Sequence, residues 1–194
     1  MRISDKGRYI MKKKLIIALM LVMALVVTAC GAGSSSDSGT DSDASGDGTY
    51  VGEAMPEFAT YDIMGNEVTN DVFKDAELTV VNVWGTFCGP CIEEMPDLQA
   101  LSEKYAGKVQ FIGFVGVVNG IEDTEHVEAA KEITEQAGVK FTNLVLSADF
   151  NEFMSGIVGF PTTIFVDKDG NILGDPIVGS NTPATDEFIA GALN

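Results

Sequence analysis

The chain has 194 residues, of which 45% are hydrophobic, and its 29 acidic residues against 12 basic ones give a formal net charge of −17. Such a surface repels nucleic acid and anionic lipid headgroups, which argues against a protein that binds them through a basic patch. The sequence holds three cysteines, too few for a small domain stapled by several disulfides.

The N-terminal region has the pattern of an exported lipoprotein. A basic segment at 12–14 precedes an apolar run of 13 residues at 15–27, which is short for a membrane span and suits a signal peptide. The run ends in Val-Thr-Ala-Cys, which resembles a bacterial lipobox. We predict a lipoprotein signal peptide at 1–29, cleavage before Cys30 and a lipid on the Cys30 sulfur. An ordinary signal peptide and an uncleaved anchor are the alternatives, and either Met1 or Met11 is the true start.

A polar segment separates this leader from the rest of the chain. Residues 31–49 consist of Gly, Ser, Asp, Thr and Ala, which cannot bury enough surface to order themselves. We predict a lipid-anchored acidic linker at 30–52 and one compact domain at 53–194. From Cys30 onward 28 acidic residues face 6 lysines, a net charge of −22. We expect a monomer that is held at the extracytoplasmic face of the bacterial cell membrane.

Apolar runs and helical spacings predict an α/β domain in which strands and helices alternate. Turn residues at Met64-Gly65-Asn66 and Asp167-Lys168-Asp169-Gly170 indicate two hairpins. In chain order, we expect strands at 57–62, 67–69 and 78–84, a helix at 88–106, a strand at 109–118, a helix at 123–137, strands at 141–146, 162–166 and 171–178, and a helix at 185–193.

Two cysteines stand where the buried strand at 78–84 gives way to the first long helix, in the motif Cys88-Gly89-Pro90-Cys91. At a helix N-terminus the free backbone N–H groups and the macrodipole favour negative charge, so the first sulfur ionises readily. The second sulfur lies one helical turn away and can close a short disulfide with the first. This pattern predicts a thiol–disulfide oxidoreductase.

Two segments resemble the TlpA/ResA-like thioredoxin-fold proteins. They are Val81-Asn82-Val83-Trp84-Gly85-Thr86-Phe87-Cys88-Gly89-Pro90-Cys91 and Gly159-Phe160-Pro161-Thr162-Thr163-Ile164-Phe165-Val166-Asp167. The resemblance implies a thioredoxin-like three-layer α/β/α sandwich with an N-terminal β-hairpin extension and a helix-containing central insert. It also implies that Cys88 is the nucleophile, that Cys91 is the resolving thiol and that Pro161 is a cis-proline. Phe87 departs from the family, which usually has Trp there.

Other residues of these segments are candidates for contact with clients or for proton transfer. Trp84, Phe87 and Phe160 are expected to form an apolar rim around the sulfurs, beside Gly89 and Pro90, although Trp84 by itself is more typical of a core. The Phe160 backbone would pair with an incoming peptide as an added strand.

Thioredoxin carries a buried aspartate six residues before its first cysteine, where this chain has Asn82, which cannot titrate. Glu94, three residues after Cys91, matches a glutamate of ResA-like proteins and is the candidate base. The alternative is a solvated carboxylate such as its neighbour Glu93.

Three classes of function remain at this stage. The first is a membrane-tethered reductase of disulfides in exported client proteins, which a membrane donor of the CcdA/DsbD type keeps reduced. The others are an exported disulfide oxidase and a thioredoxin-fold metallochaperone. A further interpretation is that the two cysteines are half of a zinc site. Such a site needs two more ligands, for which His126 and distant carboxylates are the candidates. We predict no metal and no cofactor beyond the redox-active disulfide. The sequence leaves the client, the reduction potential and the direction of electron flow open.

Overall fold

The structure is a computed structural model that describes residues 53–116, 118 and 120–194. The signal peptide predicted at 1–29, the linker at 30–52 and the lipidation site Cys30 lie outside these residues. The account below therefore concerns the domain predicted at 53–194.

A mixed seven-stranded sheet with the order β2-β1-β5-β4-β3-β6-β7 forms the centre of the domain. β4 pairs in parallel with both β3 and β5, whereas β1, β6 and β7 each run antiparallel to a neighbour. The parallel strands β3, β4 and β5 therefore present their carboxyl ends at one edge of the sheet. The strands are β1 (Ala59–Asp62), β2 (Glu67–Thr69), β3 (Leu78–Trp84), β4 (Val109–Val115), β5 (Thr142–Val145), β6 (Thr162–Asp167) and β7 (Ile172–Val178).

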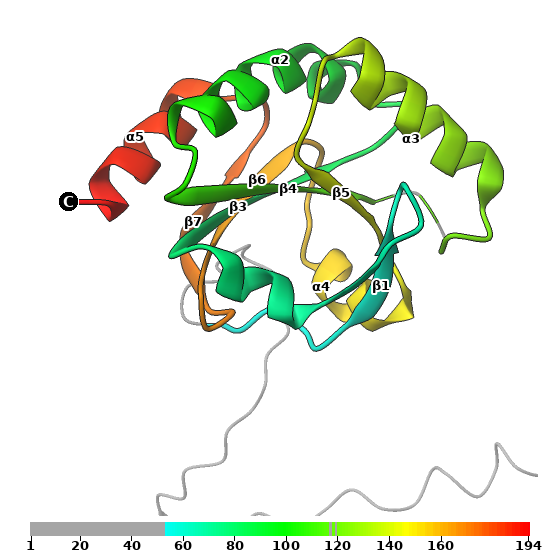
Figure 1. Ribbon diagram of the computed structural model, residues 1–194, viewed down its shortest axis with the longest axis horizontal. Coiled ribbons are helices and arrows are strands. Elements are labelled where there is room, and N and C mark those ends of the chain that lie inside the picture. The colour runs from blue at the N-terminus through cyan, green and yellow to red at the C-terminus, as the bar shows by residue number, and fades with distance from the viewer. Residues whose placement is uncertain (1–52, 117, 119) are drawn as a thin grey trace, which may run out of the picture. The chain divides into compact units, whose positions relative to one another are not determined.

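Helices cover both faces of the sheet (Figure 1). One face carries the long helices α2 (Gly89–Lys104), α3 (Thr124–Gln136) and α5 (Thr182–Ala192). The other face carries the short helices η1 (Asn70–Asp75), η2 (Ala148–Phe150) and α4 (Asn151–Ser155). The β1–β2 hairpin lies at one side of the sheet, and α3 and α4 lie in the chain between β4 and β6. This arrangement confirms the thioredoxin-like α/β fold predicted from the sequence.

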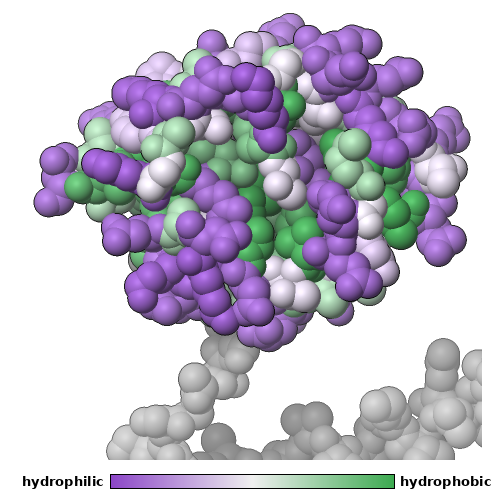
Figure 2. Space-filling view, in the orientation of Figure 1, coloured by the Kyte–Doolittle hydropathy of each residue, from purple (hydrophilic) through white to green (hydrophobic). Residues whose placement is uncertain are grey.

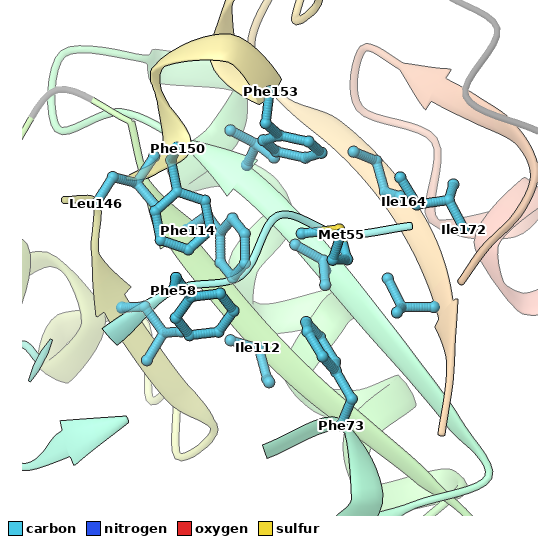
Figure 3. Packing of buried hydrophobic residues seen from close by; sticks show 14 residues of the cluster. Met55, Phe58, Phe73, Ile112, Phe114, Leu146, Phe150, Phe153, Ile164 and Ile172 are labelled. Carbon is cyan, nitrogen blue, oxygen red and sulfur yellow. The ribbon is translucent and has the colours of Figure 1, made fainter. Parts of the chain in front are cut away.

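Alternation along β3 assigns its side chains to the two faces, because successive residues of a strand point to opposite sides. Val81 and Val83 pack into an aromatic cluster on the face of the short helices, whereas Val80 packs beneath α2 and α5. Figure 3 shows the aromatic cluster, in which the rings of Phe58 and Phe150 have centroids 4.7 Å apart. Each large apolar side chain buried in this way stabilises the fold by about 1.5–3 kcal/mol.

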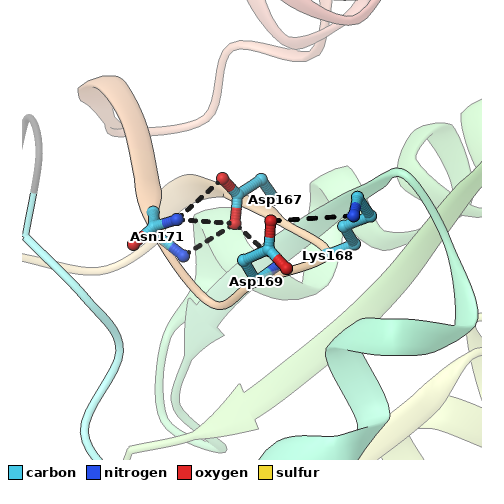
Figure 4. A network of polar contacts seen from close by, with 4 residues as sticks. All are labelled: Asp167, Lys168, Asp169 and Asn171. Atoms are coloured by element: carbon cyan, nitrogen blue, oxygen red, sulfur yellow. Dashed lines mark hydrogen bonds and ion pairs between the residues drawn. The ribbon is translucent and has the colours of Figure 1, made fainter.

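The turn between β6 and β7 fixes the end of the domain that lies opposite the cysteines. Asp167 accepts hydrogen bonds from the backbone N–H groups of Asp169 and Asn171 and from the Asn171 side chain (Figure 4). Gly170 has φ +86°, which a residue with a side chain rarely adopts. Asn171 also forms a β-bridge with Ala54. The N-terminal end of the described chain is therefore attached at the end of β6, which pairs with the start of β3.

Three differences from the sequence prediction have identifiable causes. The helices η1, η2 and α4 were not predicted because they are too short to show a helical period. The last helix begins at Thr182, not at 185, because Asn181 caps it by accepting from the Ala184 N–H at 3.2 Å, and Pro183 in the first turn needs no N–H partner. β4 ends at Val115, not at 118, because its two neighbours β3 and β5 end at Trp84 and Val145, the residues that pair with Val115.

Hydrophilic side chains dominate the face in Figure 2, and they surround a strip of hydrophobic ones across its middle. None of the helices within the described residues has the length and apolar character needed to cross a bilayer.

Candidate active site

The two cysteines lie where β3 passes into α2, at the carboxyl edge of the parallel strands. Cys88 is the N-cap residue of α2, and its Sγ accepts a hydrogen bond from the Cys91 N–H at 3.3 Å. The two sulfurs form a disulfide with an S–S distance of 2.01 Å. A sulfur at this position faces the free N–H groups of the first helical turn, which favour the thiolate once the disulfide is reduced.

The two sulfurs differ in accessibility. Cys88 keeps 7% of its surface exposed and Cys91 keeps none, while Gly89 and Pro90 between them are exposed. A partner that approaches from solvent meets Cys88 first. This order agrees with the predicted roles of Cys88 as the attacking thiol and Cys91 as the resolving thiol.

Glu94 lies one turn further along α2 and is buried, with 4% of its surface exposed. Its Oε1 accepts a hydrogen bond from the Asn82 amide at 3.0 Å. Burial raises the pKa of the Glu94 carboxyl above its ordinary value of 4.5, while hydrogen bonds from the Ser180 side chain, Asn82 and the Asn181 backbone act in the opposite direction. The alternative of a solvated carboxylate is wrong for Glu94, whereas Glu93 is exposed.

Asn82 is the hydrogen-bond partner of Glu94, and the sequence did not identify it. The comparison with thioredoxin marks this position only as one that lacks an aspartate. The Asn82 amide nitrogen lies 3.0 Å from Glu94 Oε1 and 3.4 Å from Thr163 Oγ1, so it links β3 to both α2 and β6. The signal was present in the sequence, since Asn82 interrupts an otherwise apolar stretch of a buried strand. A buried amide in such a place needs a partner.

Two of the three aromatic residues predicted for the apolar rim, Phe87 and Phe160, lie beside each other. Phe87 is 71% exposed, and its ring centroid lies 6.1 Å from that of the half-buried Phe160. The Phe160–Pro161 peptide bond is cis, which confirms the predicted geometry. A Cβ on Gly85 would lie 3.1 Å from the Phe87 ring, so the glycine lets this ring fold back beside Phe160.

Trp84 was wrongly predicted to belong to this rim. It is 1% exposed, and its Nε1 donates to Asn143 Oδ1 at 2.9 Å beneath the helices. The indole passes over Gly113 of β4, where an added Cβ would lie 1.9 Å from Asn143 Oδ1 and 3.0 Å from Trp84 Nε1. A glycine inside a strand often marks such a close approach, so Gly113 was the available signal. Trp84 thus lies beneath the active site, in the same buried apolar cluster as Cys88 and Cys91.

Among the described residues, no group of three or more His, Cys, Asp or Glu side chains is placed to hold a metal ion. His126 is exposed and lies 2.9 Å from Asp123 Oδ1 on α3. The structure therefore does not bring His126 to the cysteine pair as part of a side-chain cluster.

Comparisons with known proteins agree with this geometry. The Redoxin family profile matches residues 50–192. The thiol-disulfide oxidoreductase ResA of Bacillus thuringiensis (strain Al Hakam) is 30% identical over 136 residues, which cover 68% of this chain and 72% of ResA. The thioredoxin-like protein YneN of Bacillus subtilis (strain 168) is 25% identical over 70% of this chain and 75% of its own length.

Solved structures show the same fold. A thiol:disulfide interchange protein of the thioredoxin family from Chlorobium tepidum TLS has a TM-score of 0.56 at 23% identity, covering 74% of this chain and 97% of the other. StoA from Bacillus subtilis has a TM-score of 0.54 at 16% identity, covering 70% of this chain and 98% of StoA. The chain is therefore similar to thioredoxin-like proteins in fold and to thiol-disulfide oxidoreductases in sequence.

Proposed function

The chain belongs to the Redoxin family, and we propose that this thiol–disulfide oxidoreductase is a membrane-tethered, extracytoplasmic reductase of disulfides in exported client proteins. The observation that carries the proposal is the Cys88–Cys91 pair, in which the cysteine at the helix N-terminus is the more accessible one. Relatives named thiol-disulfide oxidoreductase ResA support the proposal, since this chain is 30% identical to one of them over 136 residues.

The reaction has two exchange steps. In the first, the Cys88 thiolate attacks one sulfur of the client disulfide, which forms a Cys88–client disulfide and releases the other client sulfur as a thiolate that takes a proton from water. In the second, the Cys91 thiolate attacks the Cys88 sulfur and releases the second client thiolate. The protein dithiol loses two electrons and the client disulfide gains them.

Glu94 receives the Cys91 proton in this scheme. Cys91 has no exposed surface, so its proton needs an acceptor inside the protein, and Glu94 lies one helical turn away on the same helix. A carboxyl whose pKa burial raises takes up a proton more readily than an ordinary glutamate does. In the reverse reaction the protonated carboxyl would return the proton to Cys91.

The direction of electron flow is inferred from the residues between the cysteines. Gly89-Pro90 is the thioredoxin pair, and thioredoxin is a far weaker oxidant than the exported oxidase DsbA. A reductase outside the cytoplasm needs a supply of electrons, which we assign to a membrane protein of the CcdA/DsbD type. The lipid on Cys30 and the linker at 30–52 would keep the domain near that donor.

The redox state in the cell tests the direction. Rapid acid quenching followed by alkylation should find Cys88 and Cys91 mainly as thiols, and as a disulfide when the membrane donor is removed. A pair that stays oxidised in the presence of the donor would instead indicate the exported oxidase. Absence of disulfide exchange in both directions, together with tight copper binding, would favour the metallochaperone.

Two variants test the remaining parts of the proposal. A Cys91→Ser variant should accumulate mixed disulfides between Cys88 and its clients, because the second step cannot occur. A Cys30→Ala variant should leave the membrane fraction and appear in soluble or released material. If Cys30→Ala remains with the membrane as the natural protein does, the apolar run at 15–27 is itself the anchor.

A further inference from the structure

A three-residue loop at 179–181 joins β7 to α5 and is held at both ends. The Gly179 N–H donates to the carbonyl of the cis-proline Pro161 at 2.8 Å, so the loop begins against the segment that precedes β6. Asn181 ends the loop as the N-cap residue of α5. Ser180 therefore lies between two fixed points, one at the cis-proline and one at the start of a helix.

The same loop reaches the buried carboxyl of Glu94. Ser180 donates to this carboxyl through its hydroxyl, and Asn181 donates through its backbone N–H. Asn82 donates to it from β3 at 3.0 Å. The helix α2, which carries Glu94, and the helix α5, which follows the loop, lie side by side over one face of the sheet (Figure 1). The carboxyl thus receives hydrogen bonds from the strand beneath it and from the loop beside it.

Opposing influences act on this carboxyl. Burial and the negative charge of Asp97, which is exposed on α2, raise the pKa of Glu94, whereas the hydrogen bonds from Ser180, Asn82 and Asn181 lower it. The groups that β3 and the loop present to it are neutral donors, and such donors stabilise the ionised form of a carboxyl. Losing one of them leaves Glu94 less able to ionise and therefore less able to take up a proton.

Ser180 is the donor side chain that also meets solvent. Asn82 is 2% exposed and Glu94 is 4% exposed, whereas Ser180 is an exposed residue. A hydroxyl both donates and accepts hydrogen bonds, so Ser180 can contact the carboxyl and a water molecule together. It therefore connects a buried carboxyl to the surface of the protein.

We propose that Ser180 is a positioning residue of the exchange reaction, which holds the Glu94 carboxylate ready for the Cys91 proton and links it to water. The proposal rests on the proton transfer to Glu94 in the function proposed above. In the second exchange step the Cys91 proton moves to a Glu94 oxygen, the Cys91 sulfur bonds to Cys88, and the client sulfur leaves as a thiolate. Glu94 then gives its proton to Ser180 Oγ while the Ser180 hydroxyl proton passes to water, which restores the carboxylate.

Stopped-flow fluorescence separates the two exchange steps. The reduced full chain is mixed with excess bis(2-hydroxyethyl) disulfide, which is small and neutral. Trp84 is the one tryptophan of the chain and lies in the same buried cluster as Cys88 and Cys91, so its emission can report both steps. The rate of the first step depends on the disulfide concentration, whereas the second step is internal and does not. Both rates are measured across a range of pH.

Ser180→Ala should slow the second step by about tenfold at acidic pH and much less at high pH. Loss of a hydrogen bond to a charged group shifts the ionisation of Glu94 upward by about one pH unit, which moves the rise of the rate to higher pH. The first step should not change. Ser180→Thr keeps the hydroxyl and should restore the natural rates. Ser155→Ala removes another exposed hydroxyl, one that donates to the Glu152 carbonyl, and should change neither step.

A double substitution tests whether Ser180 acts through Glu94. In a Glu94→Gln background, Ser180→Ala should have no further effect on the second step, because the group that it serves is already absent. Slowing by Ser180→Ala to the same extent at every pH, or to the same extent with and without Glu94, would overturn the proposal, since the serine would then only support the loop.

The same measurements distinguish this proposal from the proposed function. If Glu94→Gln slows the second step and Ser180→Ala does not, Ser180 has no part in the proton path and the reductase stands. If neither substitution changes that step, the role of Ser180 falls together with the role of Glu94, and the reductase still stands. If the natural protein does not reduce bis(2-hydroxyethyl) disulfide at all, the reductase itself fails.

Discussion

Two buried polar pairs lie beneath the helices on the same side of β3, and they differ in one respect. Asn82 donates to Glu94, which can carry a charge, whereas Trp84 donates to Asn143, and neither of these can. Both pairs are nearly inaccessible to solvent. The first links β3 to α2, and the second links β3 to β5 across the intervening strand β4. The two pairs are thus similar in burial and hydrogen bonding but not in proton chemistry.

This difference indicates what each pair does. A neutral, fully hydrogen-bonded pair costs little to bury and fixes the geometry of its surroundings. A buried carboxyl becomes costly once it ionises, so its presence one turn from Cys91 favours a chemical role over a structural one. We therefore expect substitutions at the Trp84–Asn143 pair to affect stability first, and substitutions at Glu94 to affect the rate first.

The largest expected effect is on stability, from Gly113→Ala. The added Cβ would lie 1.9 Å from Asn143 Oδ1, so the amide must move and the Trp84 N–H loses its acceptor. Overpacking and an unpaired buried donor each cost about 1–3 kcal/mol, so we expect a total loss of about 3 kcal/mol in urea unfolding. The exchange rate per folded molecule should change much less.

Gly191→Ala is the matched control for this substitution. Nothing lies within 4 Å of the Cβ that it would add, and the residue is in α5, where alanine is favoured over glycine. Its unfolding free energy should stay the same or rise by up to about 1 kcal/mol. An equally small effect of Gly113→Ala would mean that the Trp84–Asn143 pair does not hold β3 and β5 together.

The next effect in size is on the rate, from Glu94→Gln. Glutamine keeps the shape and can still accept from Asn82, but it cannot take the Cys91 proton. We expect disulfide exchange to slow by about tenfold or more, since general acid–base groups typically contribute about 10²–10⁴-fold. Stopped-flow Trp84 fluorescence with a small neutral disulfide substrate measures the rate, and the pH dependence of the Cys91 step should shift.

Glu93→Gln removes a neighbouring carboxylate that is exposed and has no part in this scheme. With the same neutral substrate it should change the rate by less than about twofold. Equal, small effects of the two substitutions would leave water as the acceptor of the Cys91 proton and contradict the role of Glu94.

The sequence predicted most of the elements and the position of the cysteines, because strong local patterns mark them. The apolar run of β3 was predicted with its observed bounds, Leu78–Trp84, and the Cys-Gly-Pro-Cys motif was placed correctly at the start of α2. The β6–β7 hairpin followed from its Asp-Lys-Asp-Gly turn. These features depend on neighbouring residues, so a single sequence carries them.

The burial of Trp84 and the partner of Asn82 could not be predicted in the same way. Trp84 depends on Asn143, which is 59 residues away, and on the missing side chain of Gly113 between them. Asn82 reaches Glu94, 12 residues on, because α2 packs over β3. Such contacts are set by the packing of distant segments, and the sequence marked them only as polar residues or glycines within apolar strands.

The smallest expected effect, and the sharpest test of the comparison, is the pH dependence of stability. The pKa of Glu94 is raised by burial in the folded protein, so the folded state holds its proton more tightly than the unfolded state does. Neutral Glu94 therefore contributes fully below pH 4.5, and its contribution is lost as the pH rises through the raised pKa. Glu94→Gln stays neutral throughout and should not show this loss.

The oxidised natural protein and its Glu94→Gln variant should therefore be unfolded in urea at several pH values from 4 to 8. The stability of the variant relative to the natural protein should rise with pH, by about 1.4 kcal/mol for each unit by which the Glu94 pKa is raised. Effects of Asp167, Asp186 and His126 cancel in this difference. Asn143→Leu should shift stability by the same amount at every pH, because neither member of its pair titrates. A parallel shift for Glu94→Gln as well would make the two buried pairs equivalent and remove the distinction between a chemical and a structural role.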